Sequence, residues 1–257
     1  MPKKKYELTE ITRTDIPSVT LHRIRALIDI PNVRVKAGDL GGWIESERNL
    51  SQTSDAWVSG EAMVYGNAQV LENALVRDHA KVHWAAIVCG NSRVYDYAEV
   101  CDRAKILDHA WVFGYASIAG YAIIRNFAVV GGNVKVYDAA SVGGDAWIQD
   151  DARILENAYV GGRAYICDDA EIRGYVGGIA AIYGKALIEF SSDYLTVGPF
   201  SDPGLYATFY KTRENTIRVT YGEFKGEVDE FIKTGGNEYR LAAELAKAHM
   251  FGKEENQ

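Results

Sequence analysis

The sequence of 257 residues contains only three cysteines, and their number and spacing exclude two kinds of site. Cys89, Cys101 and Cys167 are an odd set without a Cys-x-x-Cys pair. They therefore predict neither a framework of disulfides nor a cysteine-rich zinc site. Unpaired thiols fit a reducing compartment, and we expect a cytoplasmic protein without a bound metal.

Long apolar runs and an excess of basic residues are also missing. No stretch approaches the roughly 18 apolar residues that a membrane-spanning helix needs, and no apolar segment follows the basic start MPKKKYELTE. The formal net charge is -7, from 35 acidic and 28 basic side chains. This balance gives no general attraction to nucleic acid or to an anionic membrane, so we expect a soluble protein that binds neither.

What the sequence does contain is a period of six residues. From Ala56 to Val176 there are 21 positions spaced by six, of which 18 are alanine and the others are Ser92, Val134 and Val176. Two residues after each lies a second column, which is Val or Ile at 20 of 21 positions and fails only at Gly178. Residues separated by one position face the same side of a strand, so each repeat predicts one short β segment.

The residues between these β segments favour tight corners. Gly, Asn and Asp are frequent there, as in Gly66-Asn67 and Asp150-Asp151, and they tolerate left-handed backbone. Three six-residue units close a triangular coil of 18 residues, so the repeats predict about seven coils stacked as parallel strands. Alanine leaves space near the axis while Val or Ile fills each layer. The expected fold class is an all-β solenoid.

The units resemble the hexapeptide repeats of left-handed parallel β-helices. The segments LHRIRAL and GDLGGWIESERNLS, and later LTVGPF, ATFYKT and YGEFKGEVDEF, look like uncharacterised phage and prophage proteins of that kind. Some of those proteins are labelled acyltransferases on repeat similarity alone. The resemblance implies a left-handed parallel β-helix. In one departure, Gly or Asp follows the aliphatic residue one place later than usual, as at Tyr65-Gly66.

Both ends of a solenoid expose strand edges, so the flanking segments are expected to form caps. We expect residues 1–52 to be an N-terminal β cap, in which Trp43 and Ile44 begin an irregular first coil. Residues 53–190 are the predicted β-helix, modified near Gly177 and Gly178. Residues 191–257 are predicted to be a small α+β module.

The C-terminal module is predicted to contain a hairpin and two helices. The hairpin lies between Leu195 and Tyr221, and the helices follow it. In the second helix Leu241, Leu245 and Ala248 form one apolar face. We expect this face to pack on the hairpin.

Residues 18 apart stack in a column, so the outward positions can be sorted by face. One face, called the aromatic face below, consists of Trp57, Leu75, Arg93, Trp111, Val129, Trp147 and Tyr165, with Tyr95 and Phe113 beside them. The second face is charged and polar, and the third is mixed. Aromatic residues together with arginine are typical of interfaces. We expect the aromatic face to be covered by the chain's own termini, by a second copy in a homo-oligomer, by a partner protein or by a small ligand.

The histidines offer weak candidates for catalysis. His79 and His109 each follow an aspartate, which can orient a histidine as a general base. The repeat places them on different corners, so only an interface between subunits could bring such groups together. A zinc site of His79, His83 and His109 would need ligands that converge, which the repeat does not allow. Glycine-rich segments recur as corners rather than as phosphate loops, so no cofactor is expected.

One corner column is acidic, and it consists of Glu61, Asp78, Asp96, Asp150, Asp151, Asp168 and Asp169. Turn formation is the first explanation of these residues, because aspartate is a good corner residue. The alternative explanation is mimicry of a DNA phosphate backbone.

These features predict a noncatalytic β-solenoid binding protein. The hypothesis that follows from the resemblance is a phage or prophage accessory factor that engages a host protein or sequesters a small ligand. Two alternatives stay open. One is a hexapeptide-repeat acyltransferase that uses coenzyme A in a site between subunits, and the other is a DNA mimic or a structural spacer.

Overall fold

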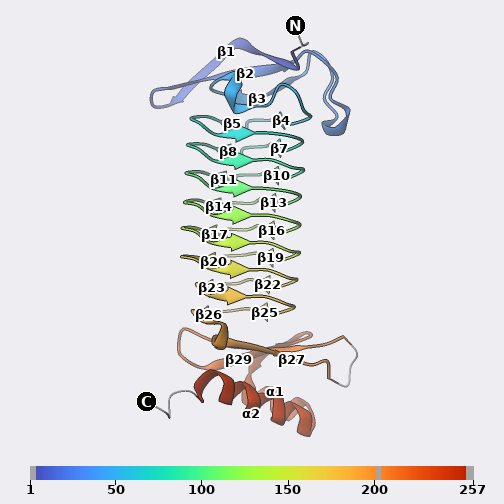
Figure 1. The fold of residues 1–257 in the computed structure, drawn as a ribbon, viewed down its shortest axis with the longest axis vertical. Coiled ribbons are helices and arrows are strands. Elements are labelled where there is room, and N and C mark those ends of the chain that lie inside the picture. The colour runs from blue at the N-terminus through green and yellow to red at the C-terminus, as the bar shows by residue number, and fades with distance from the viewer. Residues whose placement is uncertain (1–3, 201–203, 253–257) are drawn as a thin grey trace.

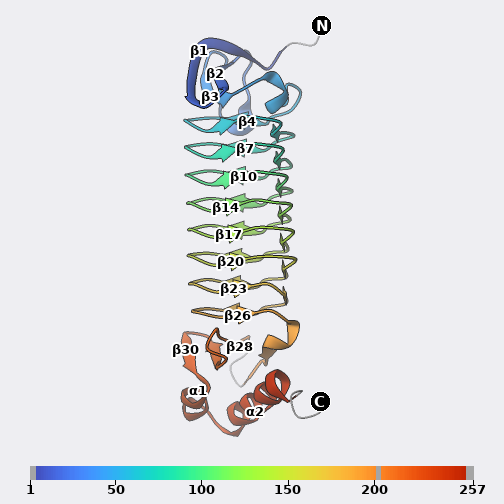
Figure 2. The ribbon, with the colours of Figure 1, turned by 90° about the vertical axis from the view of Figure 1, so that its left-hand side faces the viewer.

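The computed structural model describes residues 4–200 and 204–252, which form an elongated rod (Figure 1). A stack of about eight triangular turns makes up its length. An antiparallel β cap covers the N-terminal end, and a small sheet with two helices covers the other end (Figure 2). The predicted parallel β-solenoid is therefore confirmed.

Each turn contributes one two-residue strand to each of three parallel stacks. The first stack holds β4 (Trp57–Val58), β7 (Leu75–Val76), β10 (Arg93–Val94), β13 (Trp111–Val112), β16 (Val129–Val130), β19 (Trp147–Ile148), β22 (Tyr165–Ile166) and β25 (Ala181–Ile182). The second holds β5 (Met63–Val64), β8 (Lys81–Val82), β11 (Glu99–Val100), β14 (Ser117–Ile118), β17 (Lys135–Val136), β20 (Arg153–Ile154), β23 (Glu171–Ile172) and β26 (Leu187–Ile188). The third holds β6 (Gln69–Val70), β9 (Ile87–Val88), β12 (Lys105–Ile106), β15 (Ile123–Ile124), β18 (Ser141–Val142), β21 (Tyr159–Val160) and β24 (Tyr175–Val176).

Strand pairing follows the 18-residue period through most of the stack. Arg93 pairs with Trp111, and Trp111 pairs with Val129. The inward alanines and the inward Val and Ile residues are almost completely buried and form one continuous core. Ser92, which replaces an alanine, is also buried, and its hydroxyl donates to the carbonyl of Cys89 at 2.7 Å. The core therefore accepts this polar group because its hydrogen bond is made.

The frame of the last turns differs from the prediction. Tyr159 pairs with Tyr175, and Val160 pairs with Val176, a separation of 16 residues. Val176 thus belongs to the inward aliphatic column rather than to the alanine column. Gly174 takes the alanine position, and its carbonyl accepts a hydrogen bond from the amide of Tyr159 at 3.1 Å. This turn is two residues shorter than the others, and the shortening lies before Val176. Gly178 is an ordinary corner with φ of 69°.

The N-terminal cap extends the second stack. β1 (Tyr6–Ile16) and β2 (Val19–Ala26) pair antiparallel, and β2 pairs antiparallel with β3 (Leu40–Ile44). Trp43 and Ile44 of β3 then pair in parallel with Met63 and Val64, which confirms that they begin the first coil. Two short 3-10 helices, η1 (Pro31–Val33) and η2 (Glu47–Asn49), complete the cap.

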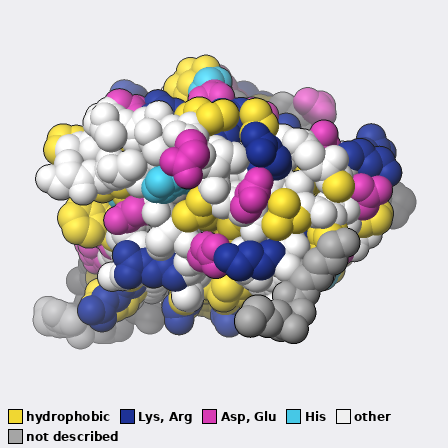
Figure 3. All heavy atoms as spheres, turned by 90° about the horizontal axis from the view of Figure 1, so that it is seen from above, with side chains coloured by type: hydrophobic (Ala, Val, Ile, Leu, Met, Phe, Trp, Pro, Cys, Tyr) yellow, Lys and Arg dark blue, Asp and Glu magenta, His cyan; other side chains and the backbone are white. Residues whose placement is uncertain are grey.

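The outer surface of the cap is of mixed character. Seen from the N-terminal end, basic, acidic and hydrophobic side chains are interspersed rather than gathered in one patch (Figure 3). A mixed polar surface at the end of a solenoid keeps the open strand edge from pairing with another chain.

The C-terminal module begins after η3 (Ser191–Asp193). Its four antiparallel strands are β27 (Tyr194–Val197), β28 (Ala207–Lys211), β29 (Ile217–Tyr221) and β30 (Phe224–Glu227), followed by α1 (Val228–Thr234) and α2 (Asn237–Phe251). The predicted hairpin and both helices are present. Neither helix has the length and apolarity to span a membrane, within the part of the chain that the structure describes.

The buried side of α2 is not the predicted one. Ala242, Ala243, Ala246 and Met250 face the module's core, whereas Leu241, Leu245 and Ala248 are exposed. The small alanine side chains let the helix pack closely on the sheet, and we attribute the burial of this side, rather than the leucine side, to that close packing.

Candidate binding face

The aromatic face is the outward side of the first stack. The first residue of each of its strands points away from the core, so the residues from Trp57 to Tyr165 form one column by strand pairing. The structure thus brings the predicted residues of this column together. Their exposure, however, differs strongly along the rod.

Trp57 is a correction to the predicted surface, because its side chain is only 1% exposed. Tyr6 of the cap contacts it edge-on with ring centroids 6.4 Å apart. The ammonium of Lys5 donates to the carbonyls of Ser54 and Ala56, each at 2.7 Å. The N-terminal segment therefore folds back over this end of the column and removes Trp57 from any binding surface. Leu75, in the next coil, is partly buried and packs against the core.

The centre of the column is open. Trp111 is 40% exposed and Trp147 is 43% exposed, and Val129 lies between them in the same column. Arg93 is exposed, and its guanidinium lies 5.2 Å from the ring centre of Trp111, a cation–π contact. Two large indoles and an arginine therefore share a short, flat stretch of surface.

Tyr95 and Phe113 support this stretch rather than stand free. Their rings stack with centroids 5.2 Å apart, and Arg77 covers the other side of Tyr95 at 4.4 Å. The ring of Phe113 lies over Gly131, where a Cβ atom would be 2.4 Å from Cζ of the ring. Both rings are consequently half-buried and fixed in place.

The C-terminal end of the column is partly covered. Tyr165 packs against Tyr183 at 5.5 Å, and its hydroxyl accepts a hydrogen bond from Gln149 at 3.2 Å. Lys225 of the C-terminal module lies 3.6 Å from the ring centre of Tyr183. Burial raises the pKa of Tyr183 to about 12, because the charged phenolate would lose its hydration there.

Both corners beside the aromatic face carry further exposed rings, which the strand positions alone did not predict. At one corner His79, Tyr97 and Tyr115 stack in series, with centroids 4.8 and 5.0 Å apart. At the other, His109 stacks on Phe127 at 4.9 Å. The signal was present in the sequence, since these residues are also 18 apart and follow the corner position directly.

The two catalytic candidates do not form a site with each other or with their preceding aspartates. The carboxylate of Asp78 contacts Arg77 at 2.9 Å and accepts the amide of Asp96. The carboxylate of Asp108 accepts the backbone amide of Asn126 at 2.9 Å. Because each carboxylate joins its own coil to the next, neither orients His79 or His109 as a base.

His109 instead belongs to the edge of the aromatic face. A shallow groove of about 350 Å³ is lined by His109, Arg93, Trp111 and Phe127. The Nε2 atom of His109 lies 3.2 Å from the amide nitrogen of Asn91. His83 is elsewhere, buried against Tyr65 at 4.9 Å with its Nε2 atom 2.9 Å from Glu99.

Four residues of the acidic corner column share the left-handed backbone conformation of a corner. Asp78, Asp96, Asp150 and Asp168 all have φ between 57° and 62°. Asp150 accepts the amide of Asp168, and Asp168 accepts the amide of Gly184 at 2.9 Å. Their carboxylates thus bind the next coil, as expected for corner residues.

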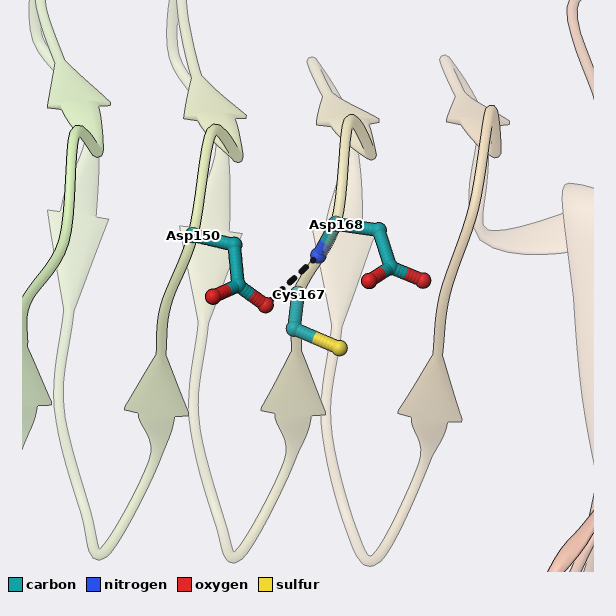
Figure 4. A group of neighbouring side chains, drawn as sticks. All are labelled: Asp150, Cys167 and Asp168. Atoms are coloured by element: carbon teal, nitrogen blue, oxygen red, sulfur yellow. Dashed lines mark hydrogen bonds between the residues drawn. The ribbon is translucent and has the colours of Figure 1, made fainter.

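One acidic pair lies beside a thiol (Figure 4). Asp150, Cys167 and Asp168 each place one potential ligand atom within 4.8 Å of the others. Burial raises the pKa of the Cys167 thiol to about 12, and the dashed hydrogen bond in the figure joins Asp150 to the next coil. We assign these groups to the corner structure.

The chain matches no family model, and no curated protein matches it either. The assignment of function therefore depends on the surfaces described above.

Proposed function

We propose that this chain is a noncatalytic β-solenoid binding protein whose aromatic face binds another protein. The observation that carries the proposal is the exposure of Trp111 and Trp147 in the middle of a column whose two ends are covered by the chain itself. The chain covers Trp57 and part of Tyr165 but leaves about two fifths of each of these two indoles exposed.

The composition of the exposed stretch supports a protein partner. Tyr97, Tyr115 and Phe127 widen the column at both corners, and all three are more than half exposed. Trp, Tyr, Phe and Arg are the residues enriched at the energetic centres of protein interfaces. The groove beside Trp111, of about 350 Å³, is near the lower limit of small-molecule sites, whereas the exposed rings extend over several coils.

The rigidity of the face also supports binding. The strands of the column from β7 to β22 are hydrogen-bonded to the coils on both sides, and the amide of Trp111, for example, donates to the carbonyl of Ala128 at 2.9 Å. Stacked rings at the corners and under the face hold further side chains in place. A surface that is ordered before binding loses little conformational entropy when a partner arrives.

An acyltransferase is less well supported. His79 and His109 stand on different corners, and neither is oriented by its aspartate. The role of a phage or prophage accessory factor that engages a host protein remains part of the proposal and depends on the repeat resemblance alone.

Site-specific photo-crosslinking tests the proposed binding face. A photoreactive phenylalanine is placed at Tyr115, beside the face, and at Lys135, on the charged face, and the protein is irradiated in lysate of its host. We expect one discrete crosslinked protein from position 115 and not from position 135. Trp111→Glu combined with Trp147→Glu should abolish that product while the circular dichroism spectrum stays unchanged.

Light scattering of the pure protein identifies whether the crosslinked protein is a second copy. A dimer that the double variant dissociates would make the partner another molecule of this chain. The proposal fails if both positions give the same products, or if the double variant crosslinks as well as the wild type.

A further inference from the structure

Trp84 has an unusual backbone conformation for a bulky residue. It occupies a corner of the coil with φ of 61°, a region in which large side chains are genuine outliers. The other corners of this column are Gly66, Asp102, Gly120, Asp138 and Glu156. Backbone strain of this kind is concentrated at functional sites.

Burial does not explain the presence of this indole. Trp84 is 66% exposed, and its ring makes a tilted contact with His83 at 6.3 Å. The chain therefore holds a tryptophan in solvent at a position where glycine or aspartate would be unstrained or better tolerated. Stability of the fold does not require it there.

A groove of about 600 Å³ opens beside Trp84. Ala85 also lines this groove, and it stands between Asn67 and Arg103, which lie one coil away on either side. The side chain of Ala85 is smaller than those of its two neighbours, which leaves space there. Tyr121, which is 61% exposed, lies two coils from Trp84, and Arg103 belongs to the coil between them. Arg48 of η2 enters from the N-terminal cap.

Two arginines, Arg48 and Arg103, and one aspartate, Asp102, line the groove. Neither Arg48 nor Arg103 forms an ion pair with any residue of 4–200 or 204–252. Arg103 donates to the hydroxyl of Tyr121 at 3.3 Å, and its guanidinium lies 5.5 Å from that ring's centre. The nearby carboxylate of Asp102 accepts the amide of Gly120 at 3.0 Å.

We propose that this groove binds a small anion that carries a planar ring, with phosphate or carboxylate as the charged group. The exposed face of Trp84 would stack on the ring, as aromatic side chains do on nucleobases, while Tyr121 holds the guanidinium of Arg103 beside it. The guanidiniums of Arg48 and Arg103 match the geometry of phosphate and carboxylate oxygens. The volume lies within the range of small-molecule sites. This site is separate from the aromatic face and does not depend on the function proposed for it.

Isothermal titration calorimetry with four probes tests the site. Adenosine monophosphate supplies a ring with phosphate, and indoleacetate supplies a ring with carboxylate. Adenosine and inorganic phosphate supply the ring alone and the anion alone. We expect at least one of the two ring-bearing anions to bind about tenfold or more tightly than adenosine or phosphate, since the two contacts act together. The tighter of the two is the probe used with the variants.

Variants connect the binding to these residues. Trp84→Gly, Arg48→Gln and Arg103→Gln should each weaken the binding of that probe about tenfold, whereas Arg125→Gln, at a different corner, should leave it unchanged. Trp84→Gly places at this corner the residue already present at Gly66 and Gly120, so it should melt no lower than the wild type. The proposal is overturned if no probe binds at millimolar concentration, or if the three groove variants bind as tightly as the wild type.

Discussion

The carboxylate of Asp96 accepts a hydrogen bond from the backbone amide of Gly114, which lies 3.1 Å away in the next coil. The same relation joins Asp102 to Gly120 and Asp138 to Glu156, each at 3.0 Å. Each aspartate thus has two functions at once. It adopts the left-handed backbone of the corner, and its side chain binds the amide that the next corner exposes.

Asp138 allows these two functions to be separated. Asp138→Ala loses the hydrogen bond and keeps a Cβ atom at φ of 60°, so we expect a loss of about 1–2 kcal/mol in the free energy of unfolding. Asp138→Gly loses the hydrogen bond but relieves the backbone, and it should cost about 1 kcal/mol less than the alanine variant. Urea denaturation measures both. An alanine variant as stable as the glycine variant would contradict this account of the corner.

Two glycines of another corner column form a matched pair for steric contact between coils. A Cβ atom on Gly162 would lie 2.4 Å from the carbonyl oxygen of Gly178, whereas a Cβ atom on Gly178 would meet nothing within 4 Å. Their φ values are 66° and 69°, so the backbone strain of an alanine is shared. We expect Gly162→Ala to lower the free energy of unfolding by about 1–3 kcal/mol more than Gly178→Ala. Equal melting temperatures of the two variants would show that the neighbouring coils can move apart to accept the added Cβ atom without loss of stability.

The inner layers should resist added volume. Ala116 is fully buried at the axis, so Ala116→Leu should lower the free energy of unfolding by about 1–3 kcal/mol. Lys135 is exposed on the second stack, and Lys135→Leu should change the stability by less than about 0.5 kcal/mol. Thermal and urea melts compare them. Similar losses for both variants would mean that the inward and outward positions have been exchanged.

The thiols should be slow to react in the folded protein. Burial and the nearby Asp102 and Glu99 raise the pKa of Cys101 to about 11 from the ordinary thiol value of 9.0. The neutral thiol is favoured in the fold, so at pH values well below the folded pKa fewer molecules carry the reactive thiolate than in the unfolded chain. At mildly alkaline pH we expect iodoacetamide to modify native Cys101 about a hundredfold more slowly than the urea-unfolded chain.

Mass spectrometry of digested samples follows each cysteine separately. Cys167, whose pKa is raised to about 12, should react more slowly still. The rate at Cys101 should still be rising above the ordinary thiol range and be half-maximal near pH 11. A half-maximal rate near pH 9 in the folded protein would refute the proposed effect of burial.

The parts of the fold that depend on local repetition could be predicted from the sequence. The small residue and the aliphatic residue seen at Ala110 and Val112 recur every six residues in the other coils. The strand positions, the corners and the aromatic column therefore follow from the spacing. The frame failed only where the repeat itself weakens. Gly174 replaces an alanine and Val176 could be assigned to either column, so the 16-residue turn needed the strand pairing to be identified.

The covering of surfaces could not be predicted in this way. Trp57 and Trp111 occupy equivalent positions in the repeat, yet only Trp57 is covered, because Tyr6 lies far away in sequence and next to it in space. The choice between Leu245 and Ala246 in α2 likewise depends on how closely the helix approaches its sheet. Trp84 differs in sequence from Gly66, Asp102, Gly120, Asp138 and Glu156 of its corner column, and the structure adds the φ angle that shows its strain.

The regular pairing of each residue with one 18 places later makes the distance between the two ends adjustable. A gene duplication or deletion of one 18-residue unit between residues 80 and 150 would preserve every contact of the cap with its first coils and of the C-terminal module with its last. It would change the length of the rod by about 4.8 Å, the spacing of paired strands. The number of coils in the middle of this chain can therefore change during evolution, and with it the distance between the two ends, without a change in either end.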